Sequence, residues 1–254
     1  MKVSILGSYI NVLPSYEETF RQLKDYLRTE NPPAYVTVNN VHTVVEGVLR
    51  PDYREITNRA LLALPDGKPL SVVAKWKGVK EIGRVFGPTF FEKTLEWGQE
   101  EGLKHFLFGG SEETLARLRE EIPRRFPRAQ VAGAVSPPFR PLTEEENAAF
   151  VRQMNASGAD IVWVAFGAPR QERWMFANYR RLRRGVMIGI GAGFDYLAGN
   201  TRHAPQWMKN ASLEWLYRLI QEPGRLWKRY LVTNTLFIIY IALEMLGIKR
   251  FEEK

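Results

Sequence analysis

The sequence predicts an α/β fold with a Rossmann-like core, in which a mostly parallel sheet carries helices on both faces. Two observations support this prediction. Short segments that are apolar throughout recur along the chain, and segments with helical periodicity separate them. Strands without polar alternation are typical of parallel sheets that are buried on both faces, and the alternation of strand and helix indicates crossover connections.

The first hundred residues follow this scheme less regularly. KVSILG (2–7) and AYVTVNN (34–40) are strand-like, and DYREITNRALLAL (52–64) resembles a helix. In that segment Asp52 and Glu55 have the spacing of a capping box, which predicts that the helix begins there. The apolar end of this predicted helix leads directly into a proline.

That proline opens a turn, Pro65-Asp66-Gly67. Proline presets φ, aspartate tolerates the left-handed region, and glycine adopts positive φ freely, so the three residues are sufficient to reverse the chain. The local sequence leaves open whether Asp66 is only a turn residue or also a carboxylate placed for chemistry.

From about residue 100 the alternation is regular. A capping box at Thr143 and Glu146 marks the start of one helix. The strand-like segments are HFLFGG (105–110), AQVAGAV (129–135), ADIVWVAFG (159–167) and GVMIGIGAGF (185–194). The helical segments are 111–126, 144–157 and 169–182.

The composition changes after about residue 200, which predicts an α/β core at 1–203 and a helical C-terminal appendage at 204–254. The stretch 231–248 approaches membrane-spanning length, but Asn234 and Glu244 interrupt the run of ~20 apolar residues that a span needs. The preceding GRLWKRY mixes Trp and Tyr with basic residues, as segments at a membrane surface do. We therefore favour a membrane-surface appendage; the alternative is a terminal helix packed on the core or on a dimer partner.

Composition excludes several classes of protein. Apolar residues make up 45% and charged residues 25%, as in ordinary globular proteins, and the absence of cysteine excludes disulfides, thiolate metal sites and a cysteine nucleophile. The formal net charge of +8 indicates an anionic partner: nucleic acid, a phosphate-bearing substrate or acidic lipid. The N-terminal MKVSILGSYINVLP lacks the features of a signal peptide, which predicts a cytoplasmic location.

Ligands of open α/β sheets bind beyond the carboxyl ends of the strands, so the polar residues at these ends are the candidates for a site. Gly109 and Gly110 precede a helix N-terminus, which suits a phosphate but is also a common strand-to-helix turn. Gln171 and Glu172 are expected beside the ligand crevice, or else to cap their helix. The other candidates at strand ends are Thr37, Asn39, Asn40, Ser111 and Asp195.

No metal or cofactor is predicted. The histidines His42, His105 and His203 are scattered without ligand spacing, and we interpret them as structural or surface residues. No Asp-x-Asp occurs that would hold a nucleotide-bound divalent ion. GIGAGF (189–194) is not a G-x-G-x-x-G fingerprint, and there is no P-loop.

Taken together, several motifs resemble the WecG/TagA/CpsF family of bacterial glycosyltransferases (glycosyltransferase family 26). Thr-x-Asn, Pro-Asp-Gly, Pro-x-Gln-Glu and Glu-Trp-x-x-Arg occur in this order, and their combination is specific where each alone is not. The resemblance extends from about Thr37 to Tyr230. The segments that carry it are TVNNVHTVVEG, LPDGKPLSVVAK, GRVFGPTF, LFGGSEET, GAPRQERW, GIGAGFDYLAGNTRHAPQW and LEWLYRLIQEPGRLWKRY.

This resemblance implies an inverting, metal-independent hexosyltransferase that is peripheral on the cytoplasmic face of the bacterial membrane. The donor is a UDP-sugar, in several members UDP-N-acetylmannosamine or its uronic acid. The acceptor is N-acetylglucosamine on undecaprenyl diphosphate, and the products enter teichoic acid, enterobacterial common antigen, exopolysaccharide or capsule synthesis. A homo-oligomer is compatible with this prediction.

The resemblance also assigns residues. Asp66 is the general base that takes the proton of the acceptor hydroxyl, which is a suitable function for a carboxylate whose pKa partial burial raises. Arg84 meets the diphosphate, and Gln171 with Asp195 contacts the nucleotide-sugar. Thr37 and Asn39 line the same pocket as Asp66. The remaining substrate-binding candidates are Gly109, Gly110, Glu172 and the appendage arginines Arg218, Arg225 and Arg229.

Three other functions compete with this prediction. A dinucleotide-dependent oxidoreductase would share the fold class but lacks the glycine fingerprint. A noncatalytic nucleotide- or membrane-binding protein would use Asp66 only as a turn residue. A nucleic-acid-binding protein is the least favoured, because the basic residues are spread through helices and the tail without an aromatic stacking platform.

Overall fold

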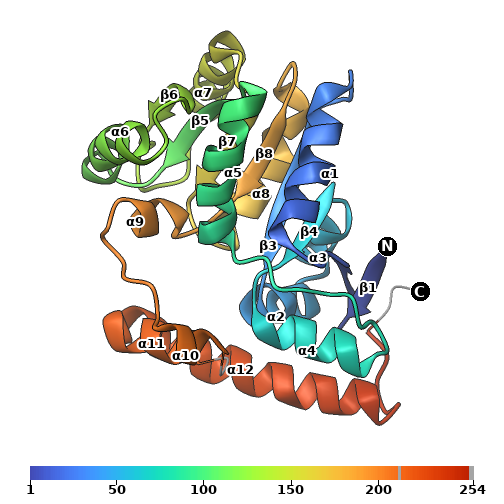
Figure 1. Ribbon diagram of the computed structural model, residues 1–254. Coiled ribbons are helices and arrows are strands. Elements are labelled where there is room, and N and C mark those ends of the chain that lie inside the picture. Colours follow the sequence, from blue (N-terminus) through green and yellow to red (C-terminus); the bar gives the residue numbers. More distant parts are fainter. Residues whose placement is uncertain (211–212, 252–254) are drawn as a thin grey trace.

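A computed structural model describes residues 1–210 and 213–251. Its centre is a parallel sheet of six strands in the order β4-β3-β8-β7-β5-β6, which confirms the predicted fold class. Figure 1 shows this sheet between two layers of helices. The strands are β3 (Ala34–Asn39), β4 (Leu62–Pro65), β5 (Lys104–Gly109), β6 (Gln130–Val135), β7 (Ile161–Ala165) and β8 (Val186–Gly189).

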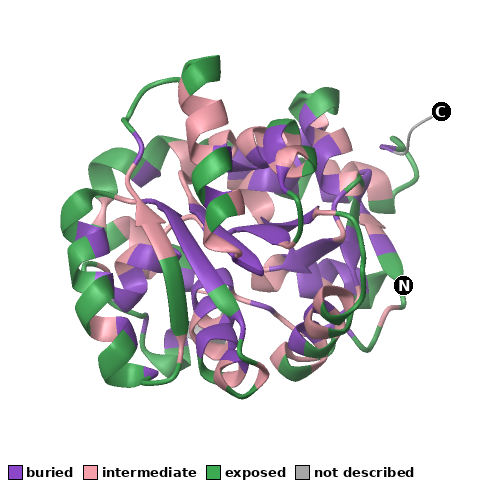
Figure 2. Ribbon diagram, turned by 90° about the horizontal axis from the view of Figure 1, so that it is seen from above, coloured by how far each residue is buried: buried purple, intermediate pink, exposed green. Residues whose placement is uncertain are grey.

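Side chains that alternate along each strand fill two apolar layers. On β7, Ile161 and Trp163 point into one layer, while Val162 and Val164 point into the other. This two-sided burial explains why the strands lack polar alternation in the sequence. Figure 2 shows the central strands buried and the outer helices exposed.

Helices cover both faces of the sheet. One layer contains α1 (Tyr16–Arg28), α5 (Gly87–Glu101), α6 (Glu112–Arg125) and α9 (Gly193–Leu197). The other contains α3 (Pro51–Asn58), α7 (Glu144–Ser157), α8 (Arg170–Asn178) and the 3₁₀ turn Tyr179–Arg181. The capping box of Thr143 and Glu146 at the start of α7 is confirmed.

The predicted helix 52–64 is wrong over its second half. Helix α3 ends at Asn58, and 62–65 form strand β4, which pairs with β3 and is buried at every position. A short apolar run has no periodicity that separates a buried strand from a buried helix, so the sequence pattern was ambiguous here. The start was also misplaced, because Arg50 is the N-cap and Pro51 is the first helical residue.

The segment 185–194 is a strand only as far as Gly189. Beyond it the chain turns at Gly191, whose φ of 54° lies in the left-handed region, and enters α9 at Gly193. The second half of the predicted strand is therefore a loop at the carboxyl edge of the sheet.

A further layer lies beside β4. The N-terminal strand prediction is confirmed in β1 (Lys2–Ile5), which forms an antiparallel hairpin with β2 (Ser8–Asn11) outside the main sheet. This hairpin shares an apolar cluster with α2 (Val41–Leu49), α4 (Lys68–Trp76) and the C-terminal helix α12 (Pro223–Met245).

The C-terminal helices α10 (Gln206–Asn210), α11 (Glu214–Gln221) and α12 run across the lower edge of the molecule in Figure 1. Phe237 and Ile241 on α12 are buried in the cluster with α2, whereas Ile238 and Ile239 are 68% and 47% exposed. One face of this helix therefore packs on the rest of the chain, and another presents apolar side chains to the outside. Within the described residues, no helix combines the length and apolarity that crossing a bilayer requires.

Candidate active site

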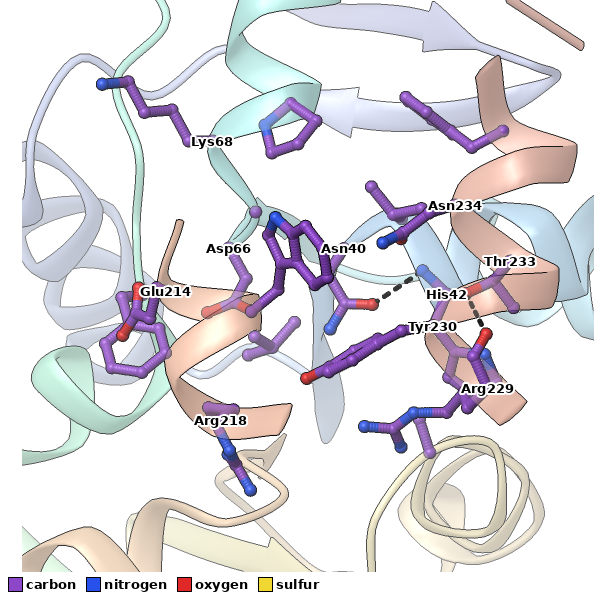
Figure 3. Close-up of a pocket in the computed structure, with 18 of the residues that line it drawn as sticks. Asn40, His42, Asp66, Lys68, Glu214, Arg218, Arg229, Tyr230, Thr233 and Asn234 are labelled. Carbon is purple, nitrogen blue, oxygen red and sulfur yellow. Dashed lines mark hydrogen bonds between the residues drawn. The ribbon is translucent and has the colours of Figure 1, made fainter. Parts of the chain in front are cut away.

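A cavity of about 930 Å³ lies at the carboxyl edge of the sheet, where β3, β4 and β8 end, and α11 and α12 form its other wall. Figure 3 shows its polar part, with side chains from both walls directed toward one another. The polar and charged side chains that line it are Asn40, His42, Asp66, Lys68, Arg84, Gln171, Glu214, Arg218, Arg225, Arg229, Tyr230, Thr233 and Asn234.

Asp66 is fixed in this cavity by the turn between β4 and α4. Its backbone N–H donates to the carbonyl of Asn39 over 2.8 Å, which joins the turn to the end of β3. Its carboxylate Oδ1 accepts a 2.8 Å hydrogen bond from the N–H of Gly87, the first residue of α5. The partial positive charge of a helix N-terminus is a favourable neighbour for a carboxylate.

The surroundings of Asp66 make its carboxyl more basic than usual. Desolvation by the surrounding protein raises its pKa, and Glu214 acts in the same direction. Arg84 and the N–H of Gly87 oppose the shift but do not cancel it. A carboxylate with a raised pKa is better matched to proton abstraction near neutral pH than an ordinary aspartate.

Four arginines surround the same cavity. Arg84 Nε donates to the backbone carbonyl of Asp66 over 2.6 Å, and its Nη2 pairs with Glu214. Arg218 and Arg225 share Glu222, at 2.8 and 2.5 Å. These contacts fix the positions of three of the guanidinium groups that line the cavity.

Arg229 differs from the other three. No acidic side chain in the described part of the chain forms an ion pair with it. Its Nε, like that of Arg218, is buried without a hydrogen-bond partner there. Burial and the charge of Arg229 together lower the pKa of His42 to about 4, so this histidine is neutral at pH 7. An anion at this position would satisfy the buried guanidinium.

Thr37 and Asn39 lie behind the cavity wall. Both side chains are buried, and neither lines the cavity, contrary to the prediction that they line the pocket of Asp66. Asn39 Nδ2 donates to Thr37 Oγ1 over 2.9 Å, and Thr57 Oγ1 lies 3.4 Å from Asn39 Oδ1. The next residue, Asn40, reaches the cavity and caps α2, accepting from the N–H of His42 at 3.0 Å.

Gln171 reaches the cavity and joins two loops. Its Oε1 accepts hydrogen bonds from the N–H groups of Gly167 and Gly191, at 3.2 and 3.0 Å. The amide therefore links the ends of β7 and β8. Its Nε2 donates to Glu172 Oε1 over 2.7 Å.

Glu172 does not line the cavity and is 1% exposed. Desolvation raises its pKa to about 7, despite the hydrogen bond from Gln171. Of the two neighbouring candidates, only Gln171 faces the cavity, and Glu172 supports it from behind.

We expect Glu172 to make folding stability depend on pH. From its ordinary value of 4.5 up to about 7, the folded state keeps the proton that the unfolded state loses, so stability falls as pH rises through this window. Glu172→Gln keeps the acceptor for Gln171 and removes the titration. Relative to this variant, the wild type should lose about 3 kcal/mol of unfolding free energy between about pH 5 and about pH 8, measured by urea unfolding. Parallel pH profiles for the two proteins would contradict the assignment.

The remaining candidates gather at the end of β5, away from Asp66. A Cβ on Gly109, whose φ is 127°, would lie 2.6 Å from the carbonyl of Ala165, so this glycine permits a close strand approach. Gly110 follows with φ 70°. Asp195 Oδ1 accepts hydrogen bonds from Asn200 Nδ2 over 3.3 Å and from Thr114 Oγ1 over 3.5 Å. Thr114 lies in the first turn of α6, the helix that follows Gly110. None of Gly109, Gly110 and Asp195 lines the cavity.

Several residues that line the cavity were not among the site candidates predicted from the sequence. Glu214 stands four residues before Arg218 in the Glu-Trp-x-x-Arg motif, a spacing that places both on one helix face, and this signal was present in the sequence. Lys68 follows the Pro-Asp-Gly turn directly. His42 and Tyr230 carry no spacing that distinguishes them from structural residues.

The other two histidines have structural surroundings. His105 is fully buried and accepts a hydrogen bond from Trp163 Nε1 at 3.1 Å, while His203 lies near Glu92. Across residues 1–210 and 213–251, no three His, Asp or Glu side chains are close enough together to hold a metal ion.

A carboxylate with a raised pKa beside a cluster of arginines, at the carboxyl edge of a parallel sheet, is a site for an enzyme that acts on an anionic substrate. Comparison with known sequences identifies the enzyme class. The profile of the Glycosyl transferase WecG/TagA/CpsF family matches residues 3–251, and the chain belongs to this family.

Two similar proteins come from Bacillus. The chain is 29% identical over 227 residues to a protein of Bacillus spizizenii named N-acetylglucosaminyldiphosphoundecaprenol N-acetyl-beta-D-mannosaminyltransferase. It is 27% identical over 227 residues to a protein of Bacillus subtilis with the same name. Each match covers 87% of this chain and 86% of the relative.

Proposed function

We propose that this glycosyltransferase moves a sugar from a UDP-sugar to a hydroxyl of a sugar carried on a polyprenyl diphosphate. The observation that carries the proposal is Asp66, a carboxylate with a raised pKa that faces an arginine-lined cavity. The names of both Bacillus relatives specify transfer of N-acetylmannosamine to N-acetylglucosaminyl diphosphoundecaprenol, which supports this donor sugar and this acceptor.

The proposed reaction is a single displacement with inversion. Asp66 takes the proton of the acceptor hydroxyl, whose oxygen forms a bond to the anomeric carbon of the donor sugar. The bond from that carbon to the diphosphate oxygen breaks, and UDP leaves with the electron pair. Arg84, Arg218 and Arg229 stabilise the negative charge that develops on the leaving diphosphate.

The donor is proposed to lie along the edge of the sheet, from the end of β5 toward Asp66. Between the end of β5 and Asp66, Gln171 holds the loops that follow β7 and β8. At the end of β5, Asp195 with Gly109 and Gly110 offers polar groups for the nucleoside of the donor. Thr37 and Asn39 support the wall from behind, because their hydrogen bond fixes the end of β3 next to the Asp66 turn.

We also propose that the enzyme is peripheral on the cytoplasmic face of the membrane. A lipid-linked acceptor is presented there, and α12 carries exposed apolar side chains such as Leu231 and Val232, flanked by the exposed Trp227. Apolar residues with tryptophan at their border are typical of segments that lie in the membrane interface.

The proposal is tested by measuring UDP release from a panel of UDP-sugars, with a short-chain N-acetylglucosaminyl polyprenyl diphosphate as acceptor. We expect acceptor-dependent release with UDP-N-acetylmannosamine or a related donor, a product of inverted anomeric configuration, and the same rate in excess EDTA. No release with any donor, or release that does not need the acceptor, would refute the proposed reaction.

The raised pKa of Asp66 predicts a pH dependence. The base is active only when ionised, so kcat/KM should rise with pH through a pKa above the ordinary 3.8 and then level off. The residual activity of Asp66→Asn should lack this acidic limb. A wild-type profile that is flat across the acidic range, or the same limb in the variant, would assign the titration to another group.

A further inference from the structure

One arm of the cavity differs from the part around Asp66, because apolar side chains line it. This arm runs between α4 and α12, which lie side by side in Figure 1. At its far end the two helices are joined by an ion pair between Lys77 and Glu244, at 2.6 Å. Its lining residues are Val41, Pro69, Val72, Val73, Trp76, Phe237, Ile238, Ile241, Ala242 and Met245. We call this arm the α4–α12 groove.

The spacing of these residues makes the groove continuous. On α12, Ile238, Ala242 and Met245 follow one another at intervals of four and three residues, which places them on one face of the helix. From Asn234 to Met245 this face extends over roughly 16 Å at 1.5 Å per residue. Val72 and Trp76 form the matching face of α4 at an interval of four residues.

The groove is not filled by the protein itself. Ile238, Met245 and Trp76 are 68%, 55% and 63% exposed, although they line a concave surface. Apolar side chains that line an open concavity are typical of a binding site for an apolar ligand.

The order of side chains along the cavity gives the chemistry of that ligand. On α12 the lining side chains pass from Arg225 and Arg229 through Thr233 and Asn234 to the apolar face, and Asp66 lies in the polar part of the same cavity. A lipid-linked acceptor combines parts of the same kinds: a sugar with the reacting hydroxyl, a diphosphate, and an isoprenoid chain.

We propose that the α4–α12 groove binds the isoprenoid units next to the diphosphate of the acceptor. This inference rests on the proposed function and adds a lipid-binding subsite to it. The acceptor diphosphate lies beside Thr233 and Asn234, where the polar part of the cavity meets the apolar face of α12. The isoprenoid chain leaves it along Ile238, Ala242 and Met245 toward the Lys77–Glu244 pair. The enzyme therefore recognises the lipid by direct contact, in addition to any attachment to the bilayer.

Two adjacent residues of α12 give a matched test. Ile238 lines the groove, whereas Ile239 is exposed on the same helix and does not line it. Ile238→Asp and Ile239→Asp have the same chemistry and almost the same position, and both sites are already exposed, so neither change is expected to prevent folding. Ala242→Phe, at another exposed position, fills the groove without adding charge.

The experiment measures KM for a series of N-acetylglucosaminyl diphosphate acceptors in detergent solution, from a single isoprene unit upward. In the wild type and in Ile239→Asp, each added unit should lower KM until the groove is full, by roughly tenfold or more in total. In Ile238→Asp and Ala242→Phe this dependence on chain length should disappear. Circular dichroism and thermal unfolding check the fold of each variant.

Each result decides the inference. A wild-type KM that does not depend on chain length overturns it, as does equal behaviour of Ile238→Asp and Ile239→Asp. If Ile238→Asp and Ile239→Asp behave equally and also lose binding to acceptor-free vesicles to the same extent, the apolar face of α12 contacts only the bilayer. Turnover of the single-unit acceptor by the wild type tests the proposed function separately, because that acceptor hardly enters the groove.

Discussion

Asp66→Asn is expected to lower kcat by about 10²- to 10⁴-fold, the range by which a positioned general base accelerates proton transfer. Asparagine has the shape of aspartate, and its amide oxygen can accept the hydrogen bond from the N–H of Gly87 that now holds Oδ1. The turn and the arginines should therefore remain in place, while no group remains to take the proton. The measurement is UDP release with a saturating acceptor, together with the dissociation constant of UDP by calorimetry.

We expect the affinity for UDP to change little in this variant, since Asp66 is assigned to the acceptor and the diphosphate to the arginines. Asp52→Asn is a suitable control, because this aspartate is exposed and pairs with Arg173 outside the cavity. It should retain the wild-type rate. If Asp66→Asn also keeps the wild-type rate, Asp66 is a turn residue and the proposed base is wrong.

Much of the fold was predictable because burial on both sides of the sheet leaves a direct signal in the sequence. The segment 161–165 is apolar at every position since alternate residues, such as Val162 and Trp163, enter different layers. The same signal failed at 62–65, where the apolar strand follows a helix after only a few residues, and no periodicity marks the change. Pairing with β3, a contact between distant parts of the sequence, decides that Leu62 to Pro65 are a strand.

The candidate site was predictable where a motif places a residue at a strand end, as with Asp66 and Gln171. It was less predictable where neighbouring residues of one strand end point to opposite sides, because the sequence does not show which of them faces the cavity. Along β3 successive side chains point to opposite sides, so Thr37 and Asn39 share one side and are buried, while Asn40, beyond the strand, reaches the cavity. The appendage residues Glu214 and Tyr230 depend on how α11 and α12 fold back over the sheet, and only tertiary structure shows this.

Arg229→Ala is expected to reduce kcat/KM by about 10²-fold, comparable to the loss of one electrostatic donor to a developing oxyanion. Arg229 is half-buried, has no acidic partner among the described residues, and faces the cavity. Its charge is therefore available to the diphosphate. Without that ligand, the buried Nε of Arg229 has no hydrogen-bond partner among the described residues, so removal of this side chain should not lower the melting temperature. Steady-state kinetics and thermal unfolding of the variant measure both effects.

Arg225→Ala provides the comparison on the same helix. The Arg225 side chain is 62% exposed and already pairs with Glu222, and interactions of an exposed and partly neutralised charge contribute about 0–1 kcal/mol. We therefore expect a clearly smaller loss than for Arg229→Ala. Arg229→Lys should recover part of the activity, because it restores the charge but not the planar fork of donors. Equal losses in the two alanine variants would indicate that the appendage acts through its overall positive charge, and a melting temperature lowered in Arg229→Ala would make this arginine a structural residue.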